Sequence, residues 1–383
     1  MELVRSLFAP ASPPRLWRVA ALELGPAGAS AAELSWVLAC QGAADLADRP
    51  GEPTASPAEL RGLLAPPYQG RRLLFAATDG FGNAVGWARL GLYEAFHRDL
   101  AHAAITVHPA VRRCGIGSML LDALAQASRA HCRSRLILDA PRTSASEAFA
   151  AHHGLYVTSR DLRSRLDLGS PGLMHRLNAV TAAELPHQRR RRHRSRHARP
   201  VPAYSGHDHS HDYDRSYSRE HDYSRGDSAL AALCWSGECP DEFLDQYVST
   251  LDFLHAEPAS PSATPFTHAE IRHREHAAGQ AGLREYTACL IDRASGRIAA
   301  LSSAHTADGV RGEQNETVVA PDYRGLGLAV QVKALLIREL LVAEPELGML
   351  DTYNAVDNHR MLAVNRRLGF RPLDMHAAWS LAL

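Results

Sequence analysis

The sequence lacks three features: a net charge, a dense set of cysteines and a long apolar run. Its 42 Lys and Arg residues balance 42 Asp and Glu residues, so no overall field favours a nucleic acid or a membrane surface. Its six cysteines are scattered and form no disulfide framework, which favours a reducing compartment, and we expect the cytoplasm. No stretch approaches the roughly 18 apolar residues of a membrane span. Residues 1–5 begin no apolar run of a signal peptide, so we expect a soluble protein inside the cell.

A length of 383 residues, 45% of them hydrophobic, suits two domains, each with its own core. Between them the composition changes: residues 189–199 are rich in arginine, and residues 207–228 mix His, Asp, Tyr, Ser and Arg. Aliphatic side chains are almost absent there, so this segment cannot form a core. We expect a disordered linker at 181–228, between a first domain at 1–180 and a second at 229–383. The alternative is that its arginines contact a nucleic acid or an acidic protein.

The two expected domains show the same order of elements. Each has a strand hairpin, a third strand, a glycine turn, a long helix, a strand, and a helix that ends at a glycine. In the first domain we predict strands at 71–78, 85–92, 103–107 and 135–139, a long helix that contains Leu120, Leu121 and Leu124, and a helix at 145–153. In the second we predict strands at 284–291, 297–305, 313–319 and 347–353, a long helix that buries Leu328 to Leu340, and a helix at 358–368. We also expect strands at 15–25 and 377–383, and helices at 31–40, 240–255 and 267–279.

A direct alignment supports an internal duplication. The loop arginine and the closing glycine are 42 positions apart in the first copy (Arg112 to Gly154) and 45 apart in the second (Arg324 to Gly369). Agreement in both sequence and spacing is improbable by chance, so we infer two copies of one domain. With Val107 set against Val319, the aligned pairs are Pro109 with Pro321, Arg112 with Arg324, Gly115 with Gly327, and Gly117 with Ala329.

The glycine turn of the second copy, residues 324–329, is the most informative stretch. A helix that begins inside a glycine turn gathers unpaired backbone N–H groups at its N-terminus, where they can hold a pyrophosphate. Its pattern Arg-x-x-Gly-x-Ala resembles the acyl-CoA loop of the GNAT superfamily of N-acetyltransferases. Downstream, Asn358 and the run Leu368-Gly369-Phe370 are similar to the signature that closes the CoA-binding half of that family. The paired arrangement resembles tandem members such as mycothiol synthase in architecture.

This resemblance implies an α+β (mixed α/β) fold: two tandem GNAT folds, each a central, mostly antiparallel twisted sheet flanked by helices. It also implies acetyl-CoA as co-substrate and no metal. In the second copy Thr317, Val318 and Val319 would align the pantetheine arm and polarise the thioester carbonyl, with Asn358 facing that arm. The pyrophosphate would be held by the backbone of Arg324, Gly325, Leu326, Gly327, Leu328, Ala329 and Val330. The corresponding residues of the first copy are Val107, Arg112, Gly115 and Gly117.

Moving an acetyl group from a thioester to an amine requires a base or a water relay, because an alkylammonium has a pKa of about 10.4. Glu316, beside the expected thioester position, is the predicted base; the alternative is a solvated strand carboxylate. Many family members have a tyrosine four residues before the closing glycine. Here that position is Asn365, which can hydrogen-bond the leaving thiolate but cannot protonate it, and Tyr353 and Tyr323 are alternative donors.

The first copy departs further from the family pattern. It keeps the glycines of the loop but loses side chains, so we expect a degenerate domain with a structural or regulatory role, although its loop could still bind CoA. His108 is a possible base there; the alternative is a surface histidine. The departures are Arg113 and Cys114 in the loop, and Thr143, Ala150 and Leu155 at the positions of Asn358, Asn365 and Phe370.

The remaining cysteines and histidines suggest no further chemistry. Cys289 is expected in a core rather than as a nucleophile, because the sequence places no base beside it. A zinc site would have to combine the two cysteines with histidines of the linker, and their spacing is not that of a zinc finger. We therefore predict no physiological metal. The residues concerned are Cys234, Cys239, His207, His209 and His211.

We therefore predict an N-acyltransferase that transfers an acetyl group from acetyl-CoA to the amine of a small molecule or peptide. The amine would attack directly, with catalysis in the C-terminal domain and an acceptor site around residues 235–275. The alternative is a non-catalytic module that binds or senses acyl-CoA.

Overall fold

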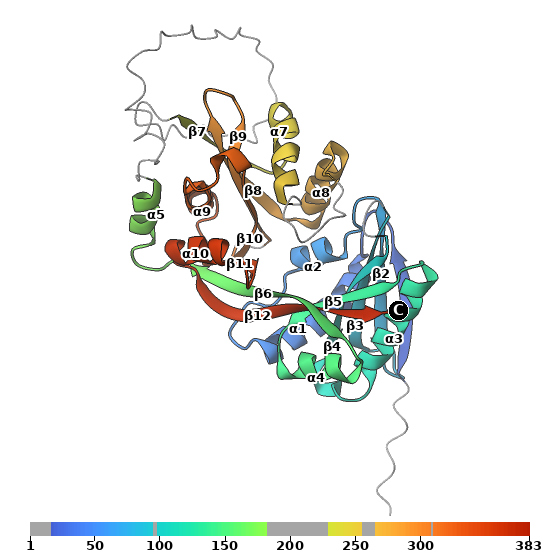
Figure 1. The fold of residues 1–383 in the computed structure, drawn as a ribbon. Coiled ribbons are helices and arrows are strands. Elements are labelled where there is room, and N and C mark those ends of the chain that lie inside the picture. The colour runs from blue at the N-terminus through green and yellow to red at the C-terminus, as the bar shows by residue number, and fades with distance from the viewer. Residues whose placement is uncertain (1–16, 95–97, 182–228, 255–264, 308) are drawn as a thin grey trace, which may run out of the picture. The chain divides into compact units, whose positions relative to one another are not determined.

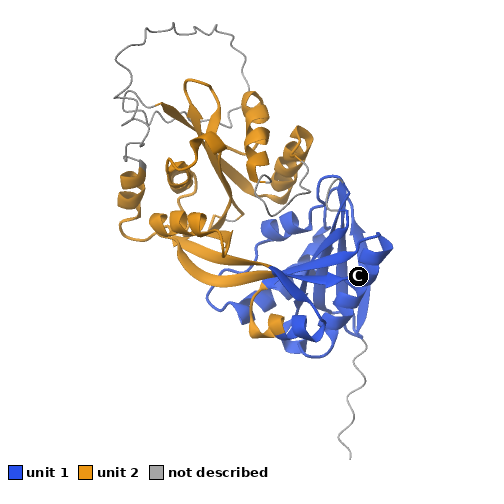
Figure 2. Cartoon of the chain, viewed as in Figure 1, with its two compact units in different colours: residues 1–140, 148–158, 378–383 blue, residues 141–147, 159–377 orange. Residues whose placement is uncertain are grey.

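The computed structural model describes residues 17–94, 98–181, 229–254, 265–307 and 309–383. The chain divides into two compact units (Figure 2). Unit 1 comprises residues 1–140, 148–158 and 378–383, and unit 2 comprises residues 141–147 and 159–377. The predicted linker lies outside the described residues except for residue 181. Within the described part of the chain, no helix is long and apolar enough to cross a membrane.

The first part of the chain builds an open sheet with helices packed on it (Figure 1). Its strand order is β1-β2-β3-β4-β5, in which β4 and β5 are parallel and the other neighbours are antiparallel. The elements are β1 (Arg18–Leu24), α1 (Ala31–Asp48), α2 (Pro57–Leu64), β2 (Gly70–Thr78), β3 (Ala84–Tyr93), β4 (Leu100–Val107), the 3₁₀ turn η1 (Pro109–Val111), α3 (Ile116–Ala130), β5 (Arg135–Pro141) and α4 (Ser144–His152).

The predicted hairpin between β2 and β3 is confirmed. The Asp79 carboxylate accepts hydrogen bonds from the backbone N–H groups of Phe81 and Asn83, and Gly82 has a φ of 85°. A short polar side chain that bonds its own turn, followed by a left-handed glycine, is the local chemistry that favours this turn.

Unit 2 repeats this plan. Its strand order is β6-β11-β10-β9-β8-β7, with β10 and β11 parallel and the other neighbours antiparallel. The elements are β6 (Tyr156–Asp167), α5 (Leu173–Thr181), β7 (Leu230–Ser236), α7 (Asp241–Leu251), the 3₁₀ turn η2 (Asp252–Leu254), α8 (His268–Ala281), β8 (Arg284–Asp292), β9 (Ile298–Thr306), β10 (Arg311–Val319), the 3₁₀ turn η3 (Pro321–Tyr323), α9 (Leu328–Ala343), β11 (Met349–Ala355), α10 (His359–Leu368) and β12 (Arg371–Ala382).

The sheet of unit 2 has a helix layer on each face. On one face, Cys289, Leu301 and Val318 form a core with side chains of α7 and α8. On the other, Ala288 and Ala300 pack with the buried side chains of helix α9. Because successive strand side chains point to opposite faces, a strand such as β8 serves both cores at once.

The predicted α+β architecture, two similar sets of strands that are each flanked by helices, is therefore confirmed. The expected domain bounds at 180 and 229 stay a prediction, because the predicted linker lies outside the described residues; the two compact units are bounded elsewhere. Residues 159–167 join unit 2 because residues 161–167 of β6 pair with β11, and residues 378–383 join unit 1. Four helices and strands of the described structure were not predicted from the sequence: α2, β6, α5 and β7.

The pairing of β6 with β11 carries a buried charge cluster, which gives a test of stability. Arg163 and Asp351 are 0% and 3% exposed, with Arg163 Nε 3.6 Å from Asp351 Oδ2. Arg165 donates two hydrogen bonds, of 2.6 and 2.8 Å, to the same carboxylate. Removing one partner of a buried pair costs about 3–5 kcal/mol, because it leaves the other charges buried and uncompensated.

We predict that Asp351→Asn lowers the free energy of unfolding by about 3 kcal/mol, measured by urea denaturation. The matched control is Asp322→Asn, which removes an exposed carboxylate 3.7 Å from Arg297 and should cost less than about 1 kcal/mol. Equal losses for the two variants would contradict this account of β6.

Candidate functional site

Strand β10 has an interrupted pairing on both of its edges. Its parallel hydrogen bonding with β11 runs from Arg311–Met349 to Gln314–Thr352 and goes no further. Against β9, the register shifts between Gln314 and Thr317, which is a β-bulge. A bulge of this kind bends the strand and leaves backbone groups unpaired, and bulges occur often beside active sites. In unit 1 the pairing of β4 with β5 also stops, at Ala103–Leu138, but β4 keeps a regular register with β3.

The predicted strand residues lie directly after this bulge. Thr317, Val318 and Val319 pair with Ser302, Leu301 and Ala300 of β9. In the described structure none of them pairs with β11, so backbone N–H groups that point to that side are available to a ligand. This geometry fits the alignment of a pantetheine arm.

The predicted glycine loop joins β10 to α9. Gly325 and Gly327 both have a φ of 78°, in the left-handed region that favours glycine, and Gly327 is the N-cap of α9. The first N–H groups of a helix have no intrahelical partner, and here they follow the unpaired end of β10. A Cβ added at Gly327 would meet no atom within 4 Å, so the space beside the loop is open. The side chains of Leu328 and Val330 are buried, so the backbone of these residues would serve a phosphate.

The loop arginines make the same contact in both copies. Arg324 Nε donates to the Val319 carbonyl at 3.3 Å, and Arg112 Nε donates to the Val107 carbonyl at 3.1 Å. Arg112 also donates two hydrogen bonds, of 2.6 and 2.8 Å, to Asp48 of α1. The first loop has left-handed φ values at Gly115 (86°) and at the non-glycine Arg113 (64°), and a Cβ added at Gly117 would meet the Phe149 ring at 3.1 Å.

Asn358 and Thr143 occupy equivalent helix starts. Asn358 is the N-cap of α10 and its Oδ1 accepts a hydrogen bond from the Met361 N–H at 3.1 Å. Thr143 Oγ1 accepts from the Ser146 N–H, also at 3.1 Å, before α4. Capping therefore accounts for these side chains in the described structure, and a role of Asn358 toward pantetheine stays a prediction.

Glu316 lies beside the bulge, but it is paired rather than free. Its carboxylate accepts hydrogen bonds of 2.9 Å from Arg274 of α8 and from the Ser303 hydroxyl. Burial acts to raise the pKa of Glu316, but the charge and hydrogen bonds of Arg274, with that of Ser303, bring the pKa below its ordinary value. Glu316 is therefore the ion-pair partner of Arg274, and its role as the base stays a prediction.

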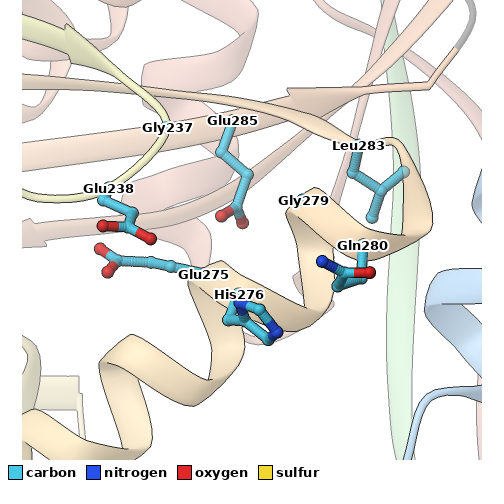
Figure 3. Close-up of a pocket in the computed structure, with 8 residues that line it drawn as sticks. All are labelled: Gly237, Glu238, Glu275, His276, Gly279, Gln280, Leu283 and Glu285. Carbon is cyan, nitrogen blue, oxygen red and sulfur yellow. The ribbon is translucent and has the colours of Figure 1, made fainter. Parts of the chain in front are cut away.

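A pocket of about 170 Å³ lies nearby, between α8, the start of β8 and the turn after β7 (Figure 3). Three carboxylates, those of Glu238, Glu275 and Glu285, are turned toward it. Glu275 is held by hydrogen bonds from the Cys239 N–H (2.8 Å) and from Arg272 (2.7 Å). The other lining residues are Gly237, His276, Gly279, Gln280 and Leu283.

Glu285 has the acid–base properties that Glu316 lacks. Burial raises its pKa to about 7; Arg274 acts to lower it, and the charges of Glu275 and Glu316 act to raise it. A carboxylate with a pKa near the working pH is suited to general-base chemistry. The sequence offered little to find it, because a glutamate at the start of a strand is usually a solvated residue.

Asn365 is buried in a short polar chain. Its Oδ1 accepts a hydrogen bond of 2.6 Å from Lys333 Nζ, and its Nδ2 donates one of 2.6 Å to Asn354 Oδ1. The two alternative donors are engaged elsewhere: Tyr323 donates to Asp292 at 2.7 Å, and the Tyr353 ring stacks edge-on with His376. Lys333 was missed, although a lysine inside the apolar run of α9 is an unusual residue.

The other candidate cysteines and histidines lie in environments that indicate a structural role. Burial raises the pKa of Cys289 well above its ordinary value, and the pKa values of Cys234 and Cys239 to about 12. His108 accepts a hydrogen bond from the Ala110 N–H and so caps η1. Among the described residues, no group of three or more His, Cys, Asp or Glu side chains could hold a metal ion. The linker histidines lie outside those residues.

Comparisons with known proteins agree with this geometry. Residues 69–157 match the model of the acetyltransferase (GNAT) domain family. This match falls in the first copy, which we had expected to be the more degenerate of the two. A comparison with curated protein sequences finds no match.

Three solved structures share the fold over nearly the whole chain. A tandem GNAT protein from the clavulanic acid biosynthesis pathway has a TM-score of 0.69 and 23% identity, over 95% of this chain and 98% of that one. A GCN5-related N-acetyltransferase from Sphaerobacter thermophilus has a TM-score of 0.60 and 12% identity, over 94% and 95%. Saccharomyces cerevisiae N-myristoyltransferase, solved with bound myristoyl-CoA, has a TM-score of 0.56 and 11% identity, over 95% and 82%. Residues 69–157 therefore match the GNAT acetyltransferase domain family, and the chain as a whole shares the fold of a tandem GNAT protein.

Proposed function

We propose that this protein is an N-acyltransferase that transfers an acetyl group from acetyl-CoA to an amine, with the reaction in unit 2. The observation that carries the proposal is the end of the β10–β11 pairing, followed by a bulge and a left-handed glycine turn into α9. These features leave backbone groups without a strand or helix partner at the end of β10 and again at the first turn of α9, which suits the amides of a pantetheine arm and then a pyrophosphate.

The residues present fit acyl-CoA, which would supply the activated thioester. The N–H groups at Gly327, Leu328, Ala329 and Val330 would hold the pyrophosphate, because they lie at the positive end of the α9 dipole. An N–H of Val318 or Val319 would polarise the thioester carbonyl and so stabilise the charge that develops on its oxygen.

The acceptor side of the proposal rests on the carboxylate pocket. Glu238, Glu275 and Glu285 would attract an ammonium and exclude anionic acceptors. Glu285, directly or through one water, would take the proton that the amine must lose before it attacks. Glu316 would pair with Arg274 through a direct hydrogen bond. Arg274 also acts to lower the pKa of Glu285, but without such a bond, so Glu285 would be the more basic of the two carboxylates.

The first test is a survey of acceptors. We expect release of free CoA thiol from acetyl-CoA in the presence of a primary amine with a second positive charge. Amines that also carry a carboxylate, and neutral alcohols, should react much more slowly, because the pocket attracts cations. Tight binding of acetyl-CoA without thiol release over a broad panel would instead favour the sensing module.

The second test asks which glycine loop binds CoA. We predict that Gly327→Val weakens CoA binding about 100-fold, measured by calorimetry, because a β-branched residue disfavours the left-handed turn and disturbs hydrogen bonds to the pyrophosphate. Gly115→Val is the matched variant in the first copy and should leave that affinity unchanged. The reverse result would move the site to unit 1, where the family model matches.

The third test separates the two candidate bases by pH. With Glu285 as base, kcat/KM falls as the pH drops below about 7, because protonation of the carboxylate removes the base. Glu285→Gln should lower kcat by about 100-fold and remove this dependence.

Two control variants accompany this test. Glu238→Gln, an exposed change in the same pocket, should mainly raise KM for the amine. If Glu316→Gln gives the larger loss of kcat and Glu285→Gln keeps the pH profile, Glu316 is the base after all.

A further inference from the structure

Lys333 is a buried amine that the fold itself does not explain. It is 1% exposed, and within the described structure its polar partners are Asn365 Oδ1 and the ring of Phe370, whose centroid is 5.3 Å away. The elements α5, α10, β8, β9 and β10 pack on α9, yet no charged group from any of them contributes to the pKa of Lys333, which burial alone lowers to about 7. A buried amine without a counter-ion costs stability, and an apolar residue would cost less.

The polar chain from Lys333 leads to the point where β10 and β11 separate. Asn365 joins Lys333 to Asn354, which lies two positions beyond Thr352, the last β11 residue paired with β10. Gln314, the partner of Thr352, is 2% exposed and its Oε1 has no hydrogen-bond partner within the described structure. Polar side chains therefore gather on both strands where the pairing ends, and within the described structure the Gln314 Oε1 atom has no partner there.

In unit 1, apolar residues occupy the positions that correspond to the Lys333–Asn365–Asn354 chain. The loop alignment that pairs Arg112 with Arg324 puts Leu121 at the position of Lys333, and Leu121 is 2% exposed. The last paired residues, Leu138 and Thr352, align Ala140 with Asn354. Ala150, 4% exposed, stands at the position of Asn365. The fold thus packs this place with Leu, Ala and Ala, so the Lys333–Asn365–Asn354 chain is not required to build it.

We propose that Lys333, acting through Asn365, is a positioning residue that stabilises the thiolate of CoA in unit 2. This inference rests on the proposed function. In the reaction the amine nitrogen bonds to the carbonyl carbon, the C–S bond breaks and its electron pair stays on sulfur. The amine proton goes to the base and then to solvent, and the released thiolate takes a proton from water. Lys333 fixes the Asn365 amide, one of whose N–H donors has no partner within the described structure, and contributes positive charge as the sulfur becomes negative.

The decisive variant replaces the chain of unit 2 with the residues of unit 1: Lys333→Leu, Asn354→Ala and Asn365→Ala. Two measurements do not depend on turnover. Thermal unfolding of the free protein should show an equal or higher midpoint for the triple variant, because a buried amine is removed. The pKa of the bound CoA thiol, followed by the ultraviolet absorbance of the thiolate, should be at least one unit lower in the wild-type protein than in the variant. That difference is a tenfold change in the thiolate-to-thiol ratio.

Lys333→Arg, which keeps a positive charge, should restore part of the shift in thiol pKa that Lys333→Leu alone removes. An unchanged thiol pKa in the triple variant would overturn the inference, and so would a large fall in its unfolding midpoint, since the chain would then be structural. If the wild-type protein binds no CoA, the proposed function fails together with this inference. If it binds CoA but the thiol pKa is unaffected by the triple variant, only this inference fails.

Discussion

The separation of two parallel strands is the constraint on which unit 2 depends. β10 and β11 share four residue pairs and then stop pairing, although both strands continue. Backbone groups beyond that point need partners, and the bulge in β10 turns some of them away from β9 as well. Because the glycine turn follows β10 directly, α9 starts beside this unpaired stretch. One break in a sheet thereby gives a strand edge and a helix N-terminus that a single extended ligand can use.

The duplication separates what the fold requires from what the chemistry requires. Both copies keep four parallel residue pairs, a 3₁₀ turn, a left-handed glycine and an arginine bonded to the preceding strand. They differ in polar content: the bulge and the Lys333–Asn365–Asn354 chain occur in unit 2, whereas Arg112 of unit 1 is bound to Asp48. The backbone features common to both copies are therefore those that the fold requires. The polar residues that differ between the copies indicate where each copy is specialised.

Electrostatics in unit 2 is organised by Arg274. Its guanidinium binds Glu316 and also lowers the pKa of Glu285, while burial and the neighbouring carboxylates raise it. Two glutamates on nearby strands thus differ in basicity because one has a direct cationic partner and the other does not. Environments that push the pKa values of neighbouring groups apart are a common way to divide acid–base roles within one site.

Local patterns in the sequence predict most of the individual strands, helices and turns of this protein. Period-2 and helical patterns gave most strands and helices, and the glycine turns followed from the left-handed conformations that glycine favours. Because the same elements and glycine turns recur in the same order, the sequence also indicates an internal duplication. The three-dimensional structure was needed to show that β6 pairs with β11 and that Asn358 caps a helix. It was also needed to show that Glu316 is the ion-pair partner of Arg274, whereas burial raises the pKa of Glu285 to about 7. The physical reason is that a carboxylate's proton affinity depends on charges and on water exclusion from elements distant in sequence, here α8, β8 and β10, which no local pattern encodes.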